Sequence, residues 1–450
     1  MGQAKKLLLW DGRVVERSEG AVLGPGRVVK EGRILMEQDR LWEVRTDNMY
    51  LNVLHEEGRF KLWYNPFVRF QRPPWGRETA LAYAESRDGL VWEKPSLGLC
   101  PYNGTTANNL LARSVHGAGV FRDDHDPDAS RRYKLVHLNE PETFSEVEAG
   151  RTAPQQRGLG VGFSADGLRW SWPADVSALT GMVGDTHNNA FWDERSGRYV
   201  CFTRMWDPTR VVARMESEDF LHWSEAEVVL RPAPSELRTY QPYAMPVFRY
   251  EDLYLGMAVM FSEHPGPDTC DLELAISTDT RSWTRPLAHQ PLIPRGERGE
   301  FDSHVIFGPT QPIIRGQEMW LFYAGCNGPH GGIRETGLGL ARLRIDGFAA
   351  WSAGEDEGRL TTSVLRCPGR RLTLNAEASK GAVRVEVLRA DGGPVEGFEQ
   401  ERCRPIGGDG VAMPVVWDAE QLPESLVGQS IRLRLHLSNA AVYACTFTEG

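Results

Sequence analysis

Four carboxylates precede segments that look like the start of buried strands. They are Glu43, Asp47, Asp185 and Asp302, and they are widely separated along the chain. Cleavage of a glycosidic bond requires two carboxyl groups, one to protonate the leaving oxygen and one to attack or to activate water. An aspartate ahead of a strand is commonly a turn or capping residue. Even so, we expect Asp185 and Asp302 to be the central catalytic carboxylates, with Glu43 or Asp47 as the third.

Aromatic and imidazole side chains occur in the same segments and suit the binding of a sugar. Flat rings offer apolar faces, and imidazoles hydrogen-bond to carboxylates or hydroxyls as readily as they transfer protons. The residues that we expect to line the substrate site are His187, Tyr240, Tyr243, His304 and His330.

A repeated motif shows which elements must position these residues. The pattern Ser-x-Asp-x-x-x-Trp occurs four times, at Ser86–Trp92, Ser164–Trp170, Ser217–Trp223 and Ser277–Trp283, and Asp346–Trp351 is a degenerate fifth copy. Such a motif is typical of a tight turn in which the Asp accepts backbone N–H groups and the Trp packs on its own sheet. Since it recurs at intervals, its role is in the fold rather than in the chemistry.

Short alternating strands surround each copy of the motif, so that the chain predicts four antiparallel strands repeated five times. Radial repetition of four-stranded sheets is the architecture of a β-propeller. The inner strands of a propeller converge on its axis, and residues at their entry ends share one pocket. We therefore expect an all-β protein, a five-bladed β-propeller followed by a C-terminal β-sandwich. The expected divisions are an N-terminal extension packing on the propeller (1–30), a catalytic propeller (31–355) and the sandwich (356–450).

Composition excludes several classes of function. Of the 450 residues, 51 are Lys or Arg and 61 are Asp or Glu, and the formal net charge is −10. Without a basic patch, binding to nucleic acid or to an anionic membrane is not expected. The apolar run Leu7–Trp10 is shorter than the roughly 7–15 residues of a secretory signal. The seven cysteines are scattered and never in CxxC spacing, which favours reduced thiols and a cytoplasmic location.

Several segments together resemble the glycoside hydrolase family 32-like proteins, within the group of five-bladed glycosidases that includes families 32, 43, 68 and 117. The resemblance covers nearly the whole chain, and it implies a glycosidase with acidic residues in the central funnel and a carbohydrate as its partner. Tyr243–Pro246 falls where family 32 enzymes carry their general acid, and it contains no carboxylate. The segments that carry the resemblance are Trp42–Glu43, Gly58–Tyr64, Tyr83–Gly98, Asn108–Asn109, Gly299–Ser303, Gly328–Gly331 and Leu372–Ala376.

Two other functions are compatible with the same pattern. One is a glycoside phosphorylase, in which Arg204, His187 and His330 would hold phosphate. The other is a non-catalytic propeller that binds carbohydrate. No cofactor or metal is expected, because no His, Cys or acidic residues have metal-ligand spacing, although some relatives hold an axial calcium ion. The sequence does not indicate an oligomeric state.

Overall fold

The computed structural model describes residues 4–71, 76–139, 158–173, 184–237, 239–263 and 268–449. It divides into two compact units. The propeller unit comprises residues 29–313 and 320–342, and the sandwich unit comprises residues 1–28, 314–319 and 343–450. In the described residues regular structure is almost entirely β, with three short 3₁₀ turns, and no helix is long and apolar enough to cross a membrane.

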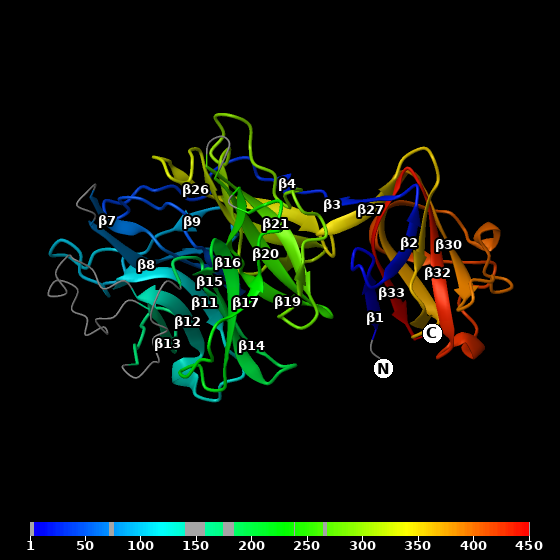
Figure 1. Cartoon of the computed structure of the whole chain (residues 1–450), viewed down its shortest axis with the longest axis horizontal. Coiled ribbons are helices and arrows are strands. Elements are labelled where there is room, and N and C mark those ends of the chain that lie inside the picture. Colours follow the sequence, from blue (N-terminus) through cyan, green and yellow to red (C-terminus); the bar gives the residue numbers. More distant parts are fainter. Residues whose placement is uncertain are drawn as a thin grey trace. The chain divides into compact units, whose positions relative to one another are not determined.

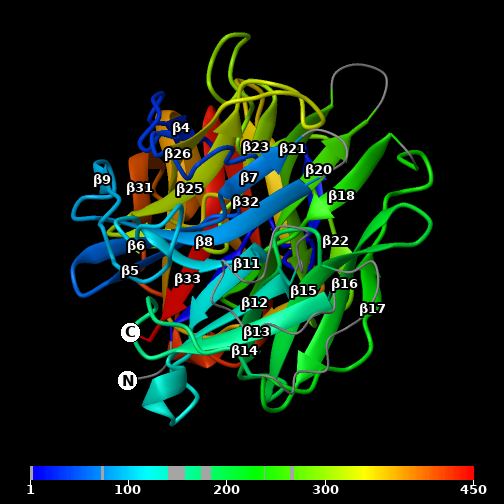
Figure 2. The same ribbon diagram turned by 90° about the vertical axis from the view of Figure 1, so that its left-hand side faces the viewer.

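The propeller unit consists of four sheets that follow one another in chain order, from blue through cyan and green to yellow-green in Figure 2. The last sheet contains two blades, which are joined by one parallel bridge between Cys270 and Val305. The expected five-bladed β-propeller is therefore present. Blade 1 has the order β10 (Leu110–Arg113), β8 (Gly76–Ser86), β6 (Arg59–Tyr64) and β5 (Asn52–Glu56), with β7 (Phe67–Gln71) and β9 (Trp92–Glu93) pairing on β8. Blade 2 is β11 (Val115–Arg122), β12 (Tyr133–Asn139) and β13 (Gly158–Ser164), with the 3₁₀ turn η1 (Ala129–Arg131) between β11 and β12.

The remaining blades have the same antiparallel pattern. Blade 3 is β14 (Asn189–Asp193), β15 (Arg198–Trp206), β16 (Arg210–Ser217) and β17 (Glu227–Leu230). Blade 4 is β18 (Tyr240–Ala244), β19 (Val247–Tyr250), β20 (Leu253–Ser262), β21 (Thr269–Ser277) and β22 (Trp283–Thr284). Blade 5 is β23 (Val305–Phe307), β24 (Ile313–Arg315), β25 (Glu318–Cys326), β26 (Thr336–Arg344) and the N-terminal β4 (Val29–Lys30).

Asparagine side chains join the inner strands of neighbouring blades. Asn52 of β5 donates to the carbonyl of Ala118 at 2.8 Å and accepts from the N–H of Val120 at 2.9 Å, both in β11. Asn189 of β14 accepts from the N–H of Val247 in β19 at 2.8 Å. Each buried amide therefore forms hydrogen bonds with backbone groups of the next blade. Leaving these buried backbone groups unpaired would cost free energy of folding.

The repeated motif forms the same turn four times. In each copy the Ser Oγ accepts the N–H of the residue three positions later, at 2.8–3.0 Å. The Asp Oδ1 accepts the N–H groups two and three positions after it, at 2.7–2.9 Å. The residue that follows the Asp has a positive φ in all four turns: Gly89 (78°), Gly167 (77°), Phe220 (66°) and Thr280 (66°).

The degenerate fifth copy does not repeat this role. Its Trp351 lies in β27 (Ala349–Ala353), which pairs with strands of the sandwich unit. Blade 5 instead takes its outer strand from β4, since Lys30 pairs with Ala341 and Val29 with Arg342 of β26. The fifth blade is thus closed by a strand from the other end of the propeller sequence, which motif spacing cannot show.

The sandwich unit also contains the first strands of the chain (Figure 1). Strands β1, β2 and β3 pair with β33, β28 and β27. Residues 1–30, expected to be an extension packing on the propeller, thus supply three strands to the sandwich unit and only β4 to a blade. The strands of this unit are β1 (Lys5–Leu8), β2 (Val15–Glu19), β3 (Val22–Pro25), β27, β28 (Gly358–Thr362), β29 (Leu365–Arg366), β30 (Arg371–Arg389), β31 (Ile406–Val415), β32 (Ser430–Ser438) and β33 (Ala440–Thr448). Two 3₁₀ turns, η2 (Gln400–Arg402) and η3 (Glu424–Leu426), lie in its loops.

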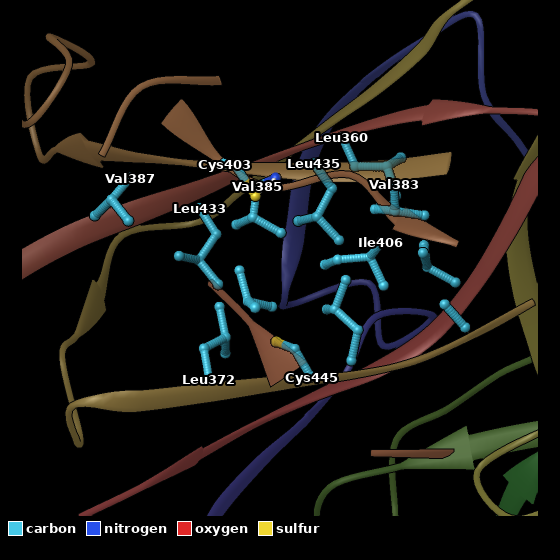
Figure 3. Packing of buried hydrophobic residues seen from close by; sticks show 14 of the residues in the cluster. Leu360, Leu372, Val383, Val385, Val387, Cys403, Ile406, Leu433, Leu435 and Cys445 are labelled. Atoms are coloured by element: carbon cyan, nitrogen blue, oxygen red, sulfur yellow. Dashed lines mark hydrogen bonds between the residues drawn. The ribbon is translucent and has the colours of Figure 1, made fainter. Parts of the chain in front are cut away.

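The core of the sandwich unit follows from alternation along its longest strand. The first part of β30 pairs with β33 and its second part with β32, so that one strand serves both layers. Val383 and Val385 are fully buried, opposite Leu437 and Leu435. Figure 3 shows Val383, Val385 and Leu435 packed in a common core with side chains such as Leu372 and Cys445. Each such side chain contributes about 1.5–3 kcal/mol of burial free energy.

Candidate functional site

One polar pocket in the propeller unit receives side chains from all five blades. Its volume is about 230 Å³. Blades 1 to 4 contribute residues at or just before their first strands, and blade 5 contributes the loop between β25 and β26. Blades 1 and 3 also contribute residues at the β6–β7 and β15–β16 connections. This is the arrangement expected of a pocket on the propeller axis. The lining residues are Asp47, Asn48, Tyr50, Asn65, Phe67, His116, Asp185, Arg204, Trp206, Arg210, Tyr243, His330 and Arg334.

Asp185 is the more open of the two pocket carboxylates. It follows Gly184, which has a φ of 93° that favours glycine, and it stands just before β14. Its Oδ1 lies 3.0 Å from Nε2 of His116, and its Oδ2 lies 3.3 Å from Nη2 of Arg204. About 35% of its side chain remains accessible. The carboxylate is therefore oriented by two neighbours and still reachable by a ligand.

Asp47 is the second pocket carboxylate, in the loop before β5. Its Oδ1 accepts from Nε of Arg45 at 2.6 Å, and its Oδ2 lies 3.9 Å from Nη2 of Arg334. Met49 and Tyr50, which follow it, have φ values of 58° and 43°. Two successive non-glycine residues in the left-handed region store backbone strain, a feature that concentrates at functional sites.

Two phenols and an amide form a hydrogen-bonded group between the blades. Nδ2 of Asn48 donates to the hydroxyl of Tyr50 at 2.8 Å and to that of Tyr243 at 3.2 Å. The two hydroxyls are 3.5 Å apart. Burial, followed by the proximity of Tyr243 and Asp185, raises the pKa of Tyr50 well above its ordinary value. Tyr50 therefore keeps its proton at neutral pH and is available as a hydrogen-bond donor.

Three arginines supply positive charge to the pocket, and a histidine lies beside them. The guanidinium of Arg204 lies 4.7 Å from the centre of the Tyr243 ring. That of Arg210 lies 4.6 Å from the ring of Trp206. Arg334 donates to Oδ1 of Asn48 at 2.7 Å. Burial, and then the charges of all three arginines, lower the pKa of His330 to about 3, so that its imidazole is neutral.

Asp302 is not among the residues that line this pocket. It is buried, and its Oδ2 accepts from Nζ of Lys30 at 2.9 Å and from the hydroxyl of Tyr323 at 2.7 Å. Lys30 belongs to β4, the strand that closes blade 5. The expected pairing of Asp185 with Asp302 is therefore corrected, because Asp302 is bound within a structural ion pair.

Glu43 is likewise placed in a structural cluster outside the pocket. It is buried, and its carboxylate lies 2.7 Å from Nζ of Lys94 and accepts from the hydroxyl of Tyr64 at 2.5 Å. It also accepts the backbone N–H groups of Asp39 and Arg40. Of the two candidates for a third carboxylate, the structure brings Asp47 rather than Glu43 to Asp185.

The five expected sugar-binding residues are divided in the same way. Tyr243 and His330 line the pocket. His187 is buried outside it, beside Oδ1 of Asn52 at 3.3 Å. The hydroxyl of Tyr240 donates to Glu273 at 2.7 Å, and Nδ1 of His304 lies 2.9 Å from the hydroxyl of Ser303. Neither Tyr240 nor His304 lines the pocket.

Several pocket residues were not identified from the sequence, including His116, Trp206, Arg210 and Arg334. Alternation along β15 places Arg204 and Trp206 two residues apart on one face, and this signal indicates a shared surface. No local pattern marks Arg334, which reaches the pocket from a loop. Across the described residues, no group of three or more His, Cys, Asp or Glu side chains is arranged to hold a metal ion.

Comparison with known proteins gives similarity in structure only. No protein-family model matches the chain, and no curated protein matches it. An N-acetylgalactosamine deacetylase from F. plautii is 14% identical, with 73% of this chain and 97% of that chain covered and a TM-score of 0.45. A β-1,2-mannobiose phosphorylase from Listeria innocua is 12% identical, with coverages of 74% and 95% and a TM-score of 0.45. A glycosyl hydrolase from Bacteroides ovatus is 13% identical, with coverages of 71% and 94% and a TM-score of 0.47.

Proposed function

We propose that this chain is a carbohydrate-active enzyme that cleaves a glycosidic bond in the axial pocket. The observation that supports this proposal is the convergence of Asp47 and Asp185, from blades 1 and 3, on one pocket of about 230 Å³. Glycosidic cleavage needs one carboxyl group as proton donor and a second that faces the anomeric carbon. Asp47 and Asp185 are the carboxylates that line this pocket in the described part of the chain.

The surroundings of the two carboxylates suit these tasks. Asp185 is held by His116 and Arg204 while part of it stays accessible, so that it can contact the reacting sugar without a change in its orientation. The hydroxyls of Tyr50 and Tyr243 can donate hydrogen bonds to sugar oxygens, and the rings of Phe67 and Trp206 offer apolar faces. The pocket therefore combines the groups that position a sugar with those that act on it.

Substitution of each carboxylate tests the proposal. Turnover of an aryl glycoside whose leaving group needs protonation should be about 10²–10⁴-fold lower in Asp185→Asn and in Asp47→Asn than in the wild-type chain. Asp124→Asn is the matched control, because that carboxylate is 74% accessible and does not line the pocket. Retention of full turnover by both pocket variants, or loss of turnover in the control alone, would refute the assignment.

The same variants separate the two roles. Loss of the proton donor should be masked by a substrate with an acidic leaving group, such as a dinitrophenyl glycoside, because that leaving group departs without protonation. Loss of the carboxylate that faces the anomeric carbon should affect all leaving groups, and azide should restore turnover in its place.

Analysis of the product as free sugar or sugar phosphate identifies whether water or phosphate is the acceptor. A wild-type chain that binds sugars but cleaves no glycoside would instead indicate a carbohydrate-binding propeller.

A further inference from the structure

The axial pocket carries an excess of positive charge. Its two carboxylates, Asp47 and Asp185, face three guanidinium groups, and Asp47 is also bound by Arg45. The chain as a whole has a formal net charge of −10, so that this positive region is local. Burying cations without matching anions is costly. The three guanidinium groups belong to Arg204, Arg210 and Arg334.

Arg210 shows the imbalance most clearly. Both its backbone N–H and its Nη1 donate to the neutral Oε1 of Gln241, at 3.3 and 3.2 Å. The carboxylate of Glu263 is a nearby negative charge, but it forms no ion pair with Arg210 among the described residues. Arg210 and Arg204 both approach the ring of Tyr243, at 5.7 and 4.7 Å. Burial, and then the charge of Arg204, lower the pKa of Arg210. Two like charges thus share one side of the pocket.

The donor capacity of the arginines is also incompletely used. Nη1 of Arg204, Nε of Arg210 and Nε of Arg334 are buried and find no acceptor within the described ranges. His330, neutral beside them, can add a further N–H donor. Guanidinium groups bind phosphate through pairs of parallel N–H···O bonds, and a phosphate group offers several oxygens to more than one arginine at once.

We propose that Arg204, Arg210 and Arg334 bind a phosphate group in the axial pocket, either as orthophosphate or as a phosphate ester on the sugar. This proposal specifies the substrate class of the proposed enzyme, and it rests on the proposed function. A phosphate group would supply the missing negative charge and accept the unused N–H groups. A neutral sugar could accept these N–H groups through its hydroxyl oxygens, but it would leave the positive charge uncompensated.

Calorimetric titration of the full chain with four probes tests the proposal at constant ionic strength. The probes are orthophosphate, a hexose phosphate, the matching uronic acid and the unsubstituted hexose. Binding of orthophosphate identifies the free anion as the ligand, and binding of the hexose phosphate alone identifies the ester. Absence of binding by both phosphates at millimolar concentration would overturn the proposal, as would equal or tighter binding of the uronic acid.

Two charge-matched variants test the residues. Arg210→Gln should weaken phosphate binding about tenfold or more, because it removes a charge-assisted contact. Arg231→Gln removes the same charge from an arginine of blade 3 that is 52% accessible and paired with Asp207, and it should leave affinity unchanged. Equal weakening by both variants would mean unspecific attraction and would overturn the site. Arg210→Lys keeps the charge but loses the paired donors, and we expect an intermediate affinity from it.

A spectroscopic readout is independent of these variants. Bound phosphate should raise the pKa of His330, measured by NMR, because it offsets the charges of the arginines that face the imidazole. Asp185, the other charged neighbour of His330, can be replaced by Asn without removing this effect.

Failure of the phosphate site can be distinguished from failure of the proposed function. A chain that cleaves glycosides but binds no phosphate fails only here, and one that binds phosphate but cleaves no glycoside fails only as an enzyme.

Discussion

Asp185 and Asp302 are both aspartates ahead of an inner strand, yet their surroundings are opposite. Asp185 keeps about 35% of its side chain accessible, whereas only 2% of Asp302 is accessible. Asp302 is bound to Lys30 and Tyr323 within blade 5. The residue type and its distance from the strand are therefore insufficient to identify a catalytic carboxylate. Its neighbours in space decide its role.

This difference predicts opposite effects of the same substitution. Asp302→Asn should lower the free energy of unfolding by about 2 kcal/mol, since hydrogen bonds to charged groups are lost from a buried site. Turnover per folded molecule should be little changed. Asp185→Asn should lower turnover and leave the free energy of unfolding nearly unchanged. Urea unfolding measures the stability of each variant, and a parallel assay measures its turnover. Loss of turnover in a stably folded Asp302→Asn protein would contradict the placement of Asp302 outside the site.

Burial of His187 predicts a pH dependence of stability. Burial lowers the pKa of His187 to about 3, so the imidazole stays neutral in the folded state. In the unfolded state the imidazole has its ordinary pKa of about 6.5 and is protonated below that pH. Stability should therefore be complete above pH 6.5 and fall as the pH decreases towards 3, by about 2 kcal/mol at pH 5 from this residue. His187→Gln should remove that part of the slope in unfolding titrations. An unchanged slope would contradict the assignment.

At the scale of elements, the repeated turn is built from local hydrogen bonds and one unusual backbone angle. The hydrogen bonds span three residues or fewer, so the motif needs no partner elsewhere in the chain. Glycine occupies the position with positive φ in blades 1 and 2, whereas Phe220 and Thr280 occupy it in blades 3 and 4. The side-chain acceptors hold the turn even where the residue itself resists that conformation.

Two glycine substitutions separate backbone strain from steric conflict. Gly58→Ala introduces a side chain at a φ of 75° in open space and should cost about 1–2 kcal/mol. Gly89→Ala has a similar φ of 78°, but its new Cβ would lie 2.9 Å from the Trp320 ring. It should therefore cost about 1–3 kcal/mol more. Thermal unfolding of the two variants checks the order, and equal costs would show that the ring moves aside freely.

At the scale of the whole molecule, the cysteines are distributed through both units as buried thiols. All seven are free and buried. Burial raises the pKa of Cys445 in the sandwich unit to about 12, and burial also raises that of Cys100 in the propeller unit to about 11. Thiolates are the reactive form, so both access and ionisation are suppressed in the folded chain.

Thiol labelling follows from this distribution. In the native protein at pH 8, a disulfide reagent such as DTNB should react with the thiols slowly, and in denaturant it should titrate all seven. The ratio of the native rate to the rate in denaturant measures how often the buried thiols become accessible. Rapid reaction of several thiols in the native protein would contradict their burial.

The sequence by itself determined the features that depend on near neighbours. The Ser-x-Asp turns, the alternating strands and the buried faces of the sandwich core at Val383 and Val385 follow from contacts within a few residues or from side-chain period. They predicted five blades and the region in which a pocket forms. Asp47, Asp185, Tyr243 and His330 were selected on this basis and line the pocket. The other selected residues do not line it: Glu43, Asp302, His187, Tyr240 and His304.

Only the tertiary structure decided which candidates meet. Lys30 reaches Asp302 because β4 closes the fifth blade, and the resulting ion pair removes that carboxylate from the pocket. Arg210 and Arg334 enter the site through contacts between segments far apart in the chain. Charge compensation and burial are properties of these long-range neighbours, and no local spacing encodes them.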